Sequence, residues 1–229
     1  GNDSSFKHIR GVDGINKVFY NLKLYAKKNP KNITIKYILM NNNSSKSELE
    51  NFVSKIICNN LTLCNFQISC NFNDEKVSDE IIFSASFLYA LLKKENIAVV
   101  FFDELLRERM TITSKDNITN IKESLKKYGL DSYIEDSANY DSICIWGNNT
   151  QTKLLLQKSL FLKDIKHIEI IDCNSVGEKI LDFTICNPAK FLESDIPILI
   201  SAVQGTPRIY YEFLKMGFDK NRLIKGIVF

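Results

Sequence analysis

A glycine turn and an aspartate are spaced along the chain as in nucleotide-binding folds, and they are the residues best suited to binding chemistry. Gly147 begins the turn, which continues through Asn148, Asn149 and Thr150, and Asp172 ends an apolar run 25 residues after Gly147. A tight turn at a helix N-terminus points backbone N–H groups at a phosphate, and the helix dipole adds positive potential. An acid about 20 residues further on accepts hydrogen bonds from ribose hydroxyls. The spacing therefore indicates a nucleotide site.

The turn departs from the G-x-G-x-x-G fingerprint because only its first glycine is present. Asn149 adopts left-handed backbone angles more readily than most residues, but its side chain would crowd a pyrophosphate. Thr152 stands at the third glycine position, where it would hold the helix away from the strand. Asp172 has an alternative role as the start of a turn with Asn174. Two interpretations stay open: a nucleotide bound at the Gly147 turn, or a degenerate unit that binds none.

The elements that must position these residues follow from the apolar runs around them. Runs at 142–146 and 167–171 are typical of buried strands, and the stretch 154–161 between them has helical character. Strand, tight turn, helix, strand and acid is the order of a βαβ unit. We therefore predict that Gly147 and Asp172 lie at the carboxyl ends of neighbouring parallel strands.

A third apolar run, 197–202, predicts another buried strand of the same unit. Gln204 and Thr206 lie beyond its carboxyl end and are predicted to face the same crevice as Gly147. Thr206 is also predicted to cap a helix that has Pro207 at its first position. Residues 223–229 are predicted to form a last short strand.

The first half of the chain alternates helices with strands. The predicted helices lie near 15–25, 49–57, 77–92 and 103–110, and the predicted strands at 33–40, 63–68 and 97–102. Such alternation predicts parallel strands joined by helical crossovers. Because it opens with a helix, we expect a strand to precede residue 1 in a longer protein. The polar segment 111–115 predicts a boundary between domains 1–112 and 113–229.

Two stretches of the first half resemble radical S-adenosylmethionine enzymes. Residues 1–14, GNDSSFKHIRGVDG, resemble the stretch after that family's fourth strand, and residues 35–52, IKYILMNNNSSKSELENF, are similar to its fifth strand, Asn-containing loop and acidic helix. Residues 63–68 would be the sixth strand. The resemblance covers about residues 1–110 and implies an α/β fold whose first part is an incomplete parallel (β/α) barrel segment.

That resemblance also implies ligands. S-adenosylmethionine and a [4Fe–4S] cluster would be bound by the full-length enzyme, but the family's C-x3-C-x2-C motif does not occur in this chain, so no cofactor, metal or complete active site is expected in it. The resemblance implies that Lys36, Tyr37, Asn41 and Asn43 face the cofactor, at the carboxyl end of a strand. Each asparagine alone is more typical of a solvated turn than of a cofactor contact.

Residues 140–229 look like the Rossmann-type domains attached to sugar-modifying and methyl-transferring enzymes, which share the strand, the glycine turn, the strand ending in Asp and a connector, here Gly177 to Pro188. The leading hypothesis is the C-terminal region of a radical S-adenosylmethionine type enzyme with a Rossmann-like domain for a nucleotide or nucleotide sugar. The alternatives are a non-catalytic binding or docking module and an NAD(P)-dependent oxidoreductase.

Composition excludes several classes. The net charge is only +3, without a basic stretch, so we expect no nucleic-acid partner. No apolar run approaches the about 20 residues of a membrane span, and no signal peptide is visible. The six cysteines lack the spacing of metal ligands, so reduced thiols in a cytoplasmic protein are expected. An incomplete barrel leaves unpaired strand edges, which predicts a homodimer.

Overall fold

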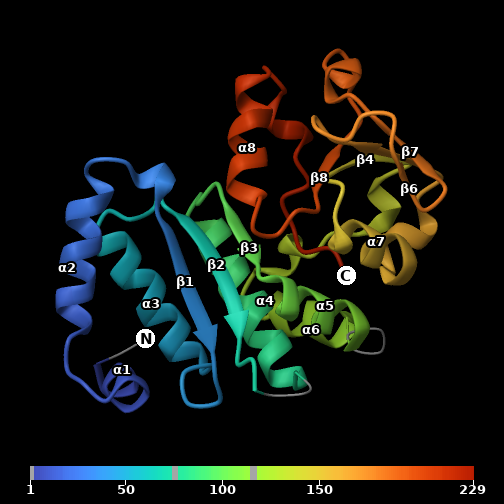
Figure 1. The fold of residues 1–229 in the computed structure, drawn as a ribbon. Coiled ribbons are helices and arrows are strands. Elements are labelled where there is room, and N and C mark those ends of the chain that lie inside the picture. Colours follow the sequence, from blue (N-terminus) through green and yellow to red (C-terminus); the bar gives the residue numbers. More distant parts are fainter. Residues whose placement is uncertain (1–2, 74–76, 114–117) are drawn as a thin grey trace. The chain divides into compact units, whose positions relative to one another are not determined.

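The computed structural model describes residues 3–73, 77–113 and 118–229, and the chain divides into two α/β units (Figure 1). The first unit comprises Gly1–Arg109 and Thr119–Leu130, and the second Met110–Ile118 and Asp131–Phe229. Part of the predicted boundary segment 111–115 lies outside the described residues. The predicted α/β class with parallel strands is confirmed.

The first unit alternates helices and strands as the sequence predicts. Its elements are α1 (Asp3–Arg10), α2 (Ile15–Ala26), β1 (Thr34–Leu39), α3 (Lys46–Cys58), β2 (Asn65–Cys70), α4 (Asp79–Lys94), β3 (Val100–Phe102), α5 (Glu104–Thr113) and α6 (Ile118–Lys126). The strands form a parallel sheet in the order β1-β2-β3. Ser45 and Ser78 cap α3 and α4, because their side chains accept the N–H groups of Glu48 and Ile81.

The two faces of this sheet differ in chemistry. On the apolar face, Tyr37 of β1 packs its ring 4.6 Å from Phe52 of α3, and Phe102 of β3 lies 5.2 Å from Tyr89 of α4. Helices α3 and α4 therefore cover this face. The alternate positions of β1 and β2 point the other way, and they include Lys36, Gln67 and Ser69. We call the face that carries these residues the polar face.

Helix α6 belongs to the first unit, which differs from the boundary predicted at residue 112. Tyr128, just after α6, packs its ring 5.2 Å from that of Phe87 in α4. The ammonium of Lys46 lies 4.6 Å from the centre of the Tyr128 ring. Leu125 is fully buried. Because of these contacts, residues 119–130 belong to the first unit. Such contacts between distant residues cannot be inferred from a local change in composition.

The second unit contains a five-stranded sheet. Its strands and helices are β4 (Ser142–Trp146), α7 (Thr150–Lys158), β5 (His167–Ile171), β6 (Lys179–Ile180), β7 (Phe183–Cys186), β8 (Ile198–Ile200) and α8 (Thr206–Lys215). The strand order is β6-β7-β5-β4-β8. All neighbouring strands are parallel except β6 and β7, which form an antiparallel pair. The predicted strand–turn–helix–strand order around Gly147 is confirmed.

Apolar side chains cover both faces of this second sheet. Ile143 and Ile145 of β4 pack in one core cluster with Leu155 of α7. Trp146, which points to the opposite face, packs in another cluster with Phe213 of α8. Buried residues on both faces are typical of a parallel sheet between helices. The alternation of β4 thus fixes α7 and α8 on opposite sides of the strand that ends at the glycine turn.

Three local predictions for the second unit differ from the structure. The connector between Gly177 and Pro188 contains the β6–β7 hairpin, whose tight turn holds Leu181 at φ 52°. A leucine seldom occupies such a conformation, so the turn carries no Asn-Gly type signal. Residues 223–229 make only isolated bridges, such as Ile134 to Ile227, instead of a strand. Helix α7 begins at Thr150, ahead of the predicted apolar stretch.

All six cysteines are free thiols. Burial raises the pKa of Cys144 in β4 to about 12, and it also raises that of Cys64. Cys58 is exposed, and Cys173 and Cys186 are partly buried. In the described part of the chain, no helix has the length and apolar character needed to cross a membrane.

Candidate functional site

The Gly147 turn requires glycine because the chain itself closes around it. Gly147 has φ 138° and donates its N–H to the carbonyl of Ile171 over 3.0 Å. A Cβ at this position would lie 2.6 Å from Nδ2 of Asn149 and 2.8 Å from the hydroxyl of Ser201. The sequence predicted that a phosphate would approach the backbone at Gly147. In the structure, the side chains of Asn149 and Ser201 occupy this position instead.

Thr152 and Ser201 fill the space beneath this turn. The Thr152 hydroxyl lies 2.5 Å from the carbonyl oxygen of Gly147 and 2.7 Å from the Ser201 hydroxyl. Asn149 caps α7, because its Oδ1 accepts the N–H of Thr152 at 3.1 Å. The residues that replace the second and third fingerprint glycines therefore serve as helix cap and spacer. Thr150 is the exposed first residue of α7.

Asp172 lies beside the glycine turn, as the spacing predicts. Its Oδ2 accepts the backbone N–H of Asn148 at 3.3 Å, and its Oδ1 accepts that of Asn174 at 2.8 Å. The carboxylate therefore links the carboxyl ends of β4 and β5. It also forms the turn with Asn174 that the sequence offered as its alternative role. A second carboxylate, that of Glu178, accepts a hydrogen bond from the Asn148 side chain at 3.1 Å.

These contacts determine which ligand groups suit the turn. Two of the backbone donors that a phosphate would use, those of Asn148 and Thr152, are engaged within the chain. Asp172 and Glu178 add negative charge next to the turn, which opposes the positive end of the α7 dipole. A hydroxyl or a cation is better matched to this edge of the sheet than a pyrophosphate.

Gln204 and Thr206 follow β8, which pairs with β4, so they lie at the same edge of the sheet as Gly147. Gln204 is exposed. The hydroxyl of Thr206 donates to the carbonyl of Ala202. The prediction that Thr206 caps α8 is wrong, because Gly205 occupies the cap position and Thr206 is the first helical residue.

In the first unit, Tyr37 and Asn43 hold the turn between β1 and α3. The Tyr37 hydroxyl donates to the carbonyl of Asn43 at 2.8 Å. The Asn43 side chain accepts the N–H of Met40 at 2.8 Å and donates to the carbonyl of Ile38 at 2.9 Å. Burial raises the pKa of Tyr37. Asn41 is an exposed residue of this turn. Tyr37 thus lies on the apolar face, away from Lys36.

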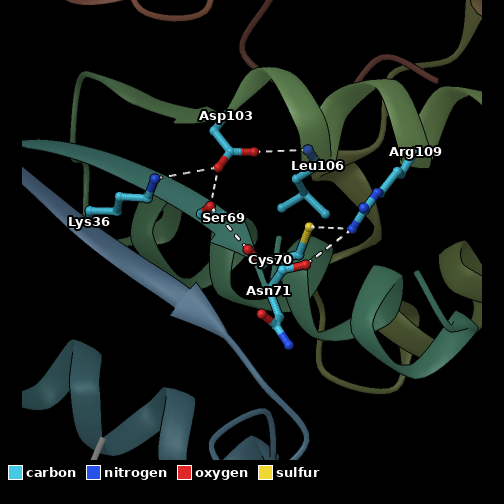
Figure 2. A network of polar contacts seen from close by, with 7 residues as sticks. All are labelled: Lys36, Ser69, Cys70, Asn71, Asp103, Leu106 and Arg109. Carbon is cyan, nitrogen blue, oxygen red and sulfur yellow. Dashed lines mark hydrogen bonds and ion pairs between the residues drawn. The ribbon is translucent and has the colours of Figure 1, made fainter. Parts of the chain in front are cut away.

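Lys36 belongs to a separate polar network that centres on Asp103 (Figure 2). The Lys36 ammonium lies 3.6 Å from Oδ2 of Asp103, to which the Ser69 hydroxyl also donates. The other carboxylate oxygen accepts the N–H of Leu106 at 2.8 Å, at the start of α5. Asp103 is only 5% exposed. Because β2 lies between β1 and β3, the Lys36 side chain reaches across the middle strand.

A second branch of the network fixes the end of β2. Arg109 of α5 donates to the carbonyl of Asn71 at 3.2 Å, and the same nitrogen lies 3.5 Å from Sγ of Cys70 (Figure 2). Burial raises the pKa of Cys70, and the nearby Arg109 opposes that change. The sequence reasoning missed Ser69, Asp103 and Arg109. The signal in the sequence was the polar residue at every second position of β2, namely Asn65, Gln67 and Ser69.

A comparison of the chain with protein-family models, with curated proteins and with solved structures gave no match. Within the described ranges, no group of three or more histidine, cysteine, aspartate or glutamate residues is placed to hold a metal ion.

Proposed function

We propose that the second unit binds the nucleoside part of a ligand at Asp172, as the accessory unit of a radical S-adenosylmethionine type enzyme. The observation that carries the proposal is the Asp172 carboxylate beside the glycine turn. Counted in chain order, the parallel strands β7, β5, β4 and β8 stand as 3-2-1-4. This order agrees with the first four positions of the Rossmann order 3-2-1-4-5-6, in which ligands bind at the carboxyl ends near strand 1, and it supports the proposal.

The charges favour a nucleoside over a dinucleotide. A carboxylate at the end of the second strand accepts hydrogen bonds from the two vicinal ribose hydroxyls. The second carboxylate, that of Glu178, accepts a hydrogen bond from the Asn148 side chain and suits a neutral or cationic group, such as a sulfonium, better than a phosphate. Adenosine and S-adenosylmethionine are therefore preferred ligands, and an NAD(P)-dependent oxidoreductase is the less favoured alternative.

Ligand-induced stabilisation tests this proposal. We expect adenosine, S-adenosylmethionine or S-adenosylhomocysteine to raise the melting temperature, because a ligand at 100 times its dissociation constant adds about 2.7 kcal/mol. Asp172→Asn should abolish the shift, since it removes the charge and one acceptor oxygen. Asp182→Asn, in the exposed β6–β7 turn, removes the same charge and should retain the shift.

Other outcomes of this panel point to the alternatives. NAD, NADP, ATP and nucleotide sugars belong in the panel, and a larger shift with any of them would contradict the preference for a nucleoside. An equal loss in both variants would show that Asp172 has no specific role. No shift with any compound would favour a non-catalytic module that docks a carrier or a partner.

The first unit supports the enzyme part of the proposal. We infer that β1, β2 and β3 are a segment of a parallel (β/α) barrel, whose helices α3 and α4 lie outside and whose polar face lines the interior. The position of α3 and α4 on one face and of polar side chains on the other agrees with this assignment. A C-x3-C-x2-C motif encoded upstream in the same gene would support it, and its absence would favour the module.

Unpaired strand edges lead to a prediction of oligomeric state. Among the residues that the structure describes, β1 and β3 each pair with one neighbouring strand, β2. Such edges present backbone donors and acceptors to another chain. We expect a homodimer of the 26.3 kDa chain in light scattering coupled to size-exclusion chromatography. A monomer over the whole accessible range of concentrations would contradict this expectation.

A further inference from the structure

The polar face of the first sheet has a composition that packing does not explain. Strands of a parallel sheet are ordinarily covered on both faces and are therefore apolar throughout. Here Lys36 of β1 and Gln67 of β2 are direct partners in the sheet register, and Ile38 is paired with Ser69. Asp103 follows the adjacent strand β3. A cation, an amide, a hydroxyl and a carboxylate thus lie on one face of three neighbouring strands, together with the apolar Ile38 and Phe101.

Two of these side chains retain capacity to bind a ligand. The Lys36 side chain is 35% exposed, and its ammonium is 5.0 Å from the centre of the exposed Phe72 ring. Gln67 is half-buried, and its amide makes no hydrogen bond to another residue in the described ranges. Neighbouring strands lie about 4.8 Å apart, so both polar groups are within reach of one small anionic group.

The other two side chains position the ammonium. Asp103 is buried and already accepts hydrogen bonds from Ser69 and from the N–H of Leu106, so it is committed within the chain. It also forms the 3.6 Å ion pair with Lys36. The pair holds the long lysine side chain across β2 and leaves the ammonium as the charged group that a ligand meets.

We propose that the polar face binds a small molecule through its carboxylate or phosphate group, which pairs with Lys36 and accepts a hydrogen bond from Gln67. Charge complementarity favours an anion, because the network contains two cations, Lys36 and Arg109, and a single carboxylate, that of the buried Asp103. The proposal concerns the first unit and does not depend on nucleoside binding at Asp172.

Titration with inorganic phosphate and with succinate tests the proposal. We expect saturable binding of at least one probe to the full chain, followed by the NMR signals of the Gln67 side-chain amide and by calorimetry. Lys36→Met keeps the aliphatic stem and should weaken binding at least tenfold, as should Gln67→Leu. Lys17→Met removes the same charge from the exposed surface of α2 and should leave the affinity unchanged. The tighter probe identifies the preferred anionic group.

Several outcomes would overturn the proposal. If neither probe saturates the change in the Gln67 signal, the proposal is wrong, because the attraction is then nonspecific. The same conclusion follows if Lys17→Met loses as much affinity as Lys36→Met. If Lys36→Met fails to fold, the Gln67 amide signal of the wild-type protein still shows whether a probe binds at this face. Asp172→Asn should leave the response to both probes unchanged, which separates this site from the nucleoside site.

Discussion

Phe213→Ala is expected to destabilise the second unit by about 3–5 kcal/mol, the usual cost of deleting a buried phenylalanine ring. Phe213 is 0% exposed. Its ring stacks on that of Phe218 with centroids 5.0 Å apart and lies 6.4 Å from that of Trp146. The deletion leaves a cavity between α8 and β4. Phe218 and Trp146 are closely packed and cannot move into this cavity without strain.

The chain contains one tryptophan, Trp146, so its fluorescence reports unfolding of the second unit. Urea titrations of the wild type and Phe213→Ala compare the two midpoints and slopes. Val176→Ala, at an exposed position of the same unit, should change stability by less than about 0.5 kcal/mol. A loss below about 1 kcal/mol in Phe213→Ala would mean that this cluster collapses around the missing ring.

The sheet of the second unit was largely predictable because its strands are apolar runs bounded by turn residues. The bounds predicted for β4 and β5, 142–146 and 167–171, are confirmed. The structure buries Trp146, the last residue of β4, against Phe213 and Phe218. In these strands, local periodicity and tertiary packing favour the same conformation.

The missed elements depend on contacts between distant residues. The β6–β7 hairpin is two to four residues per strand and turns at Leu181, so it lacks both length and turn chemistry. The place of α6 in the first unit depends on the packing of Tyr128 against Phe87, 41 positions away. A polar segment can indicate where one domain ends, but it does not indicate that a later stretch, here residues 119–130, packs in the first unit again.

The two candidate sites were predictable to different degrees. The proximity of Asp172 to Asn148 follows from the parallel order of two consecutive strands. The filling of the space beneath the turn does not follow from it, because it depends on the contact between Thr152 and Ser201, which directly follows β8 and lies 49 positions later in the chain. The link between Lys36 and Asp103 also needed the sheet order, since β2 separates the strands that carry them.

Asp103→Ala is expected to destabilise the first unit by about 2–4 kcal/mol. The substitution removes the cap of α5, worth about 1 kcal/mol, and leaves the buried Ser69 hydroxyl without its charged acceptor. It also breaks the ion pair with Lys36, whose contribution is reduced because solvent screens the partly exposed ammonium. Asp103→Asn retains an acceptor for the N–H of Leu106, so its cost should be about half as large.

Hydrogen exchange of peptides from β2 and α5 measures this effect locally. A loss of about 2–4 kcal/mol should speed exchange of their most protected amides by about 30- to 1,000-fold, because each 1.4 kcal/mol is a factor of ten. Asp79→Ala removes an exposed acid from the first turn of α4 and should cost less than about 1 kcal/mol. If Asp103→Ala and Asp79→Ala exchange alike, Asp103 does not join the three strands, and Lys36 would need another support for its position on the polar face.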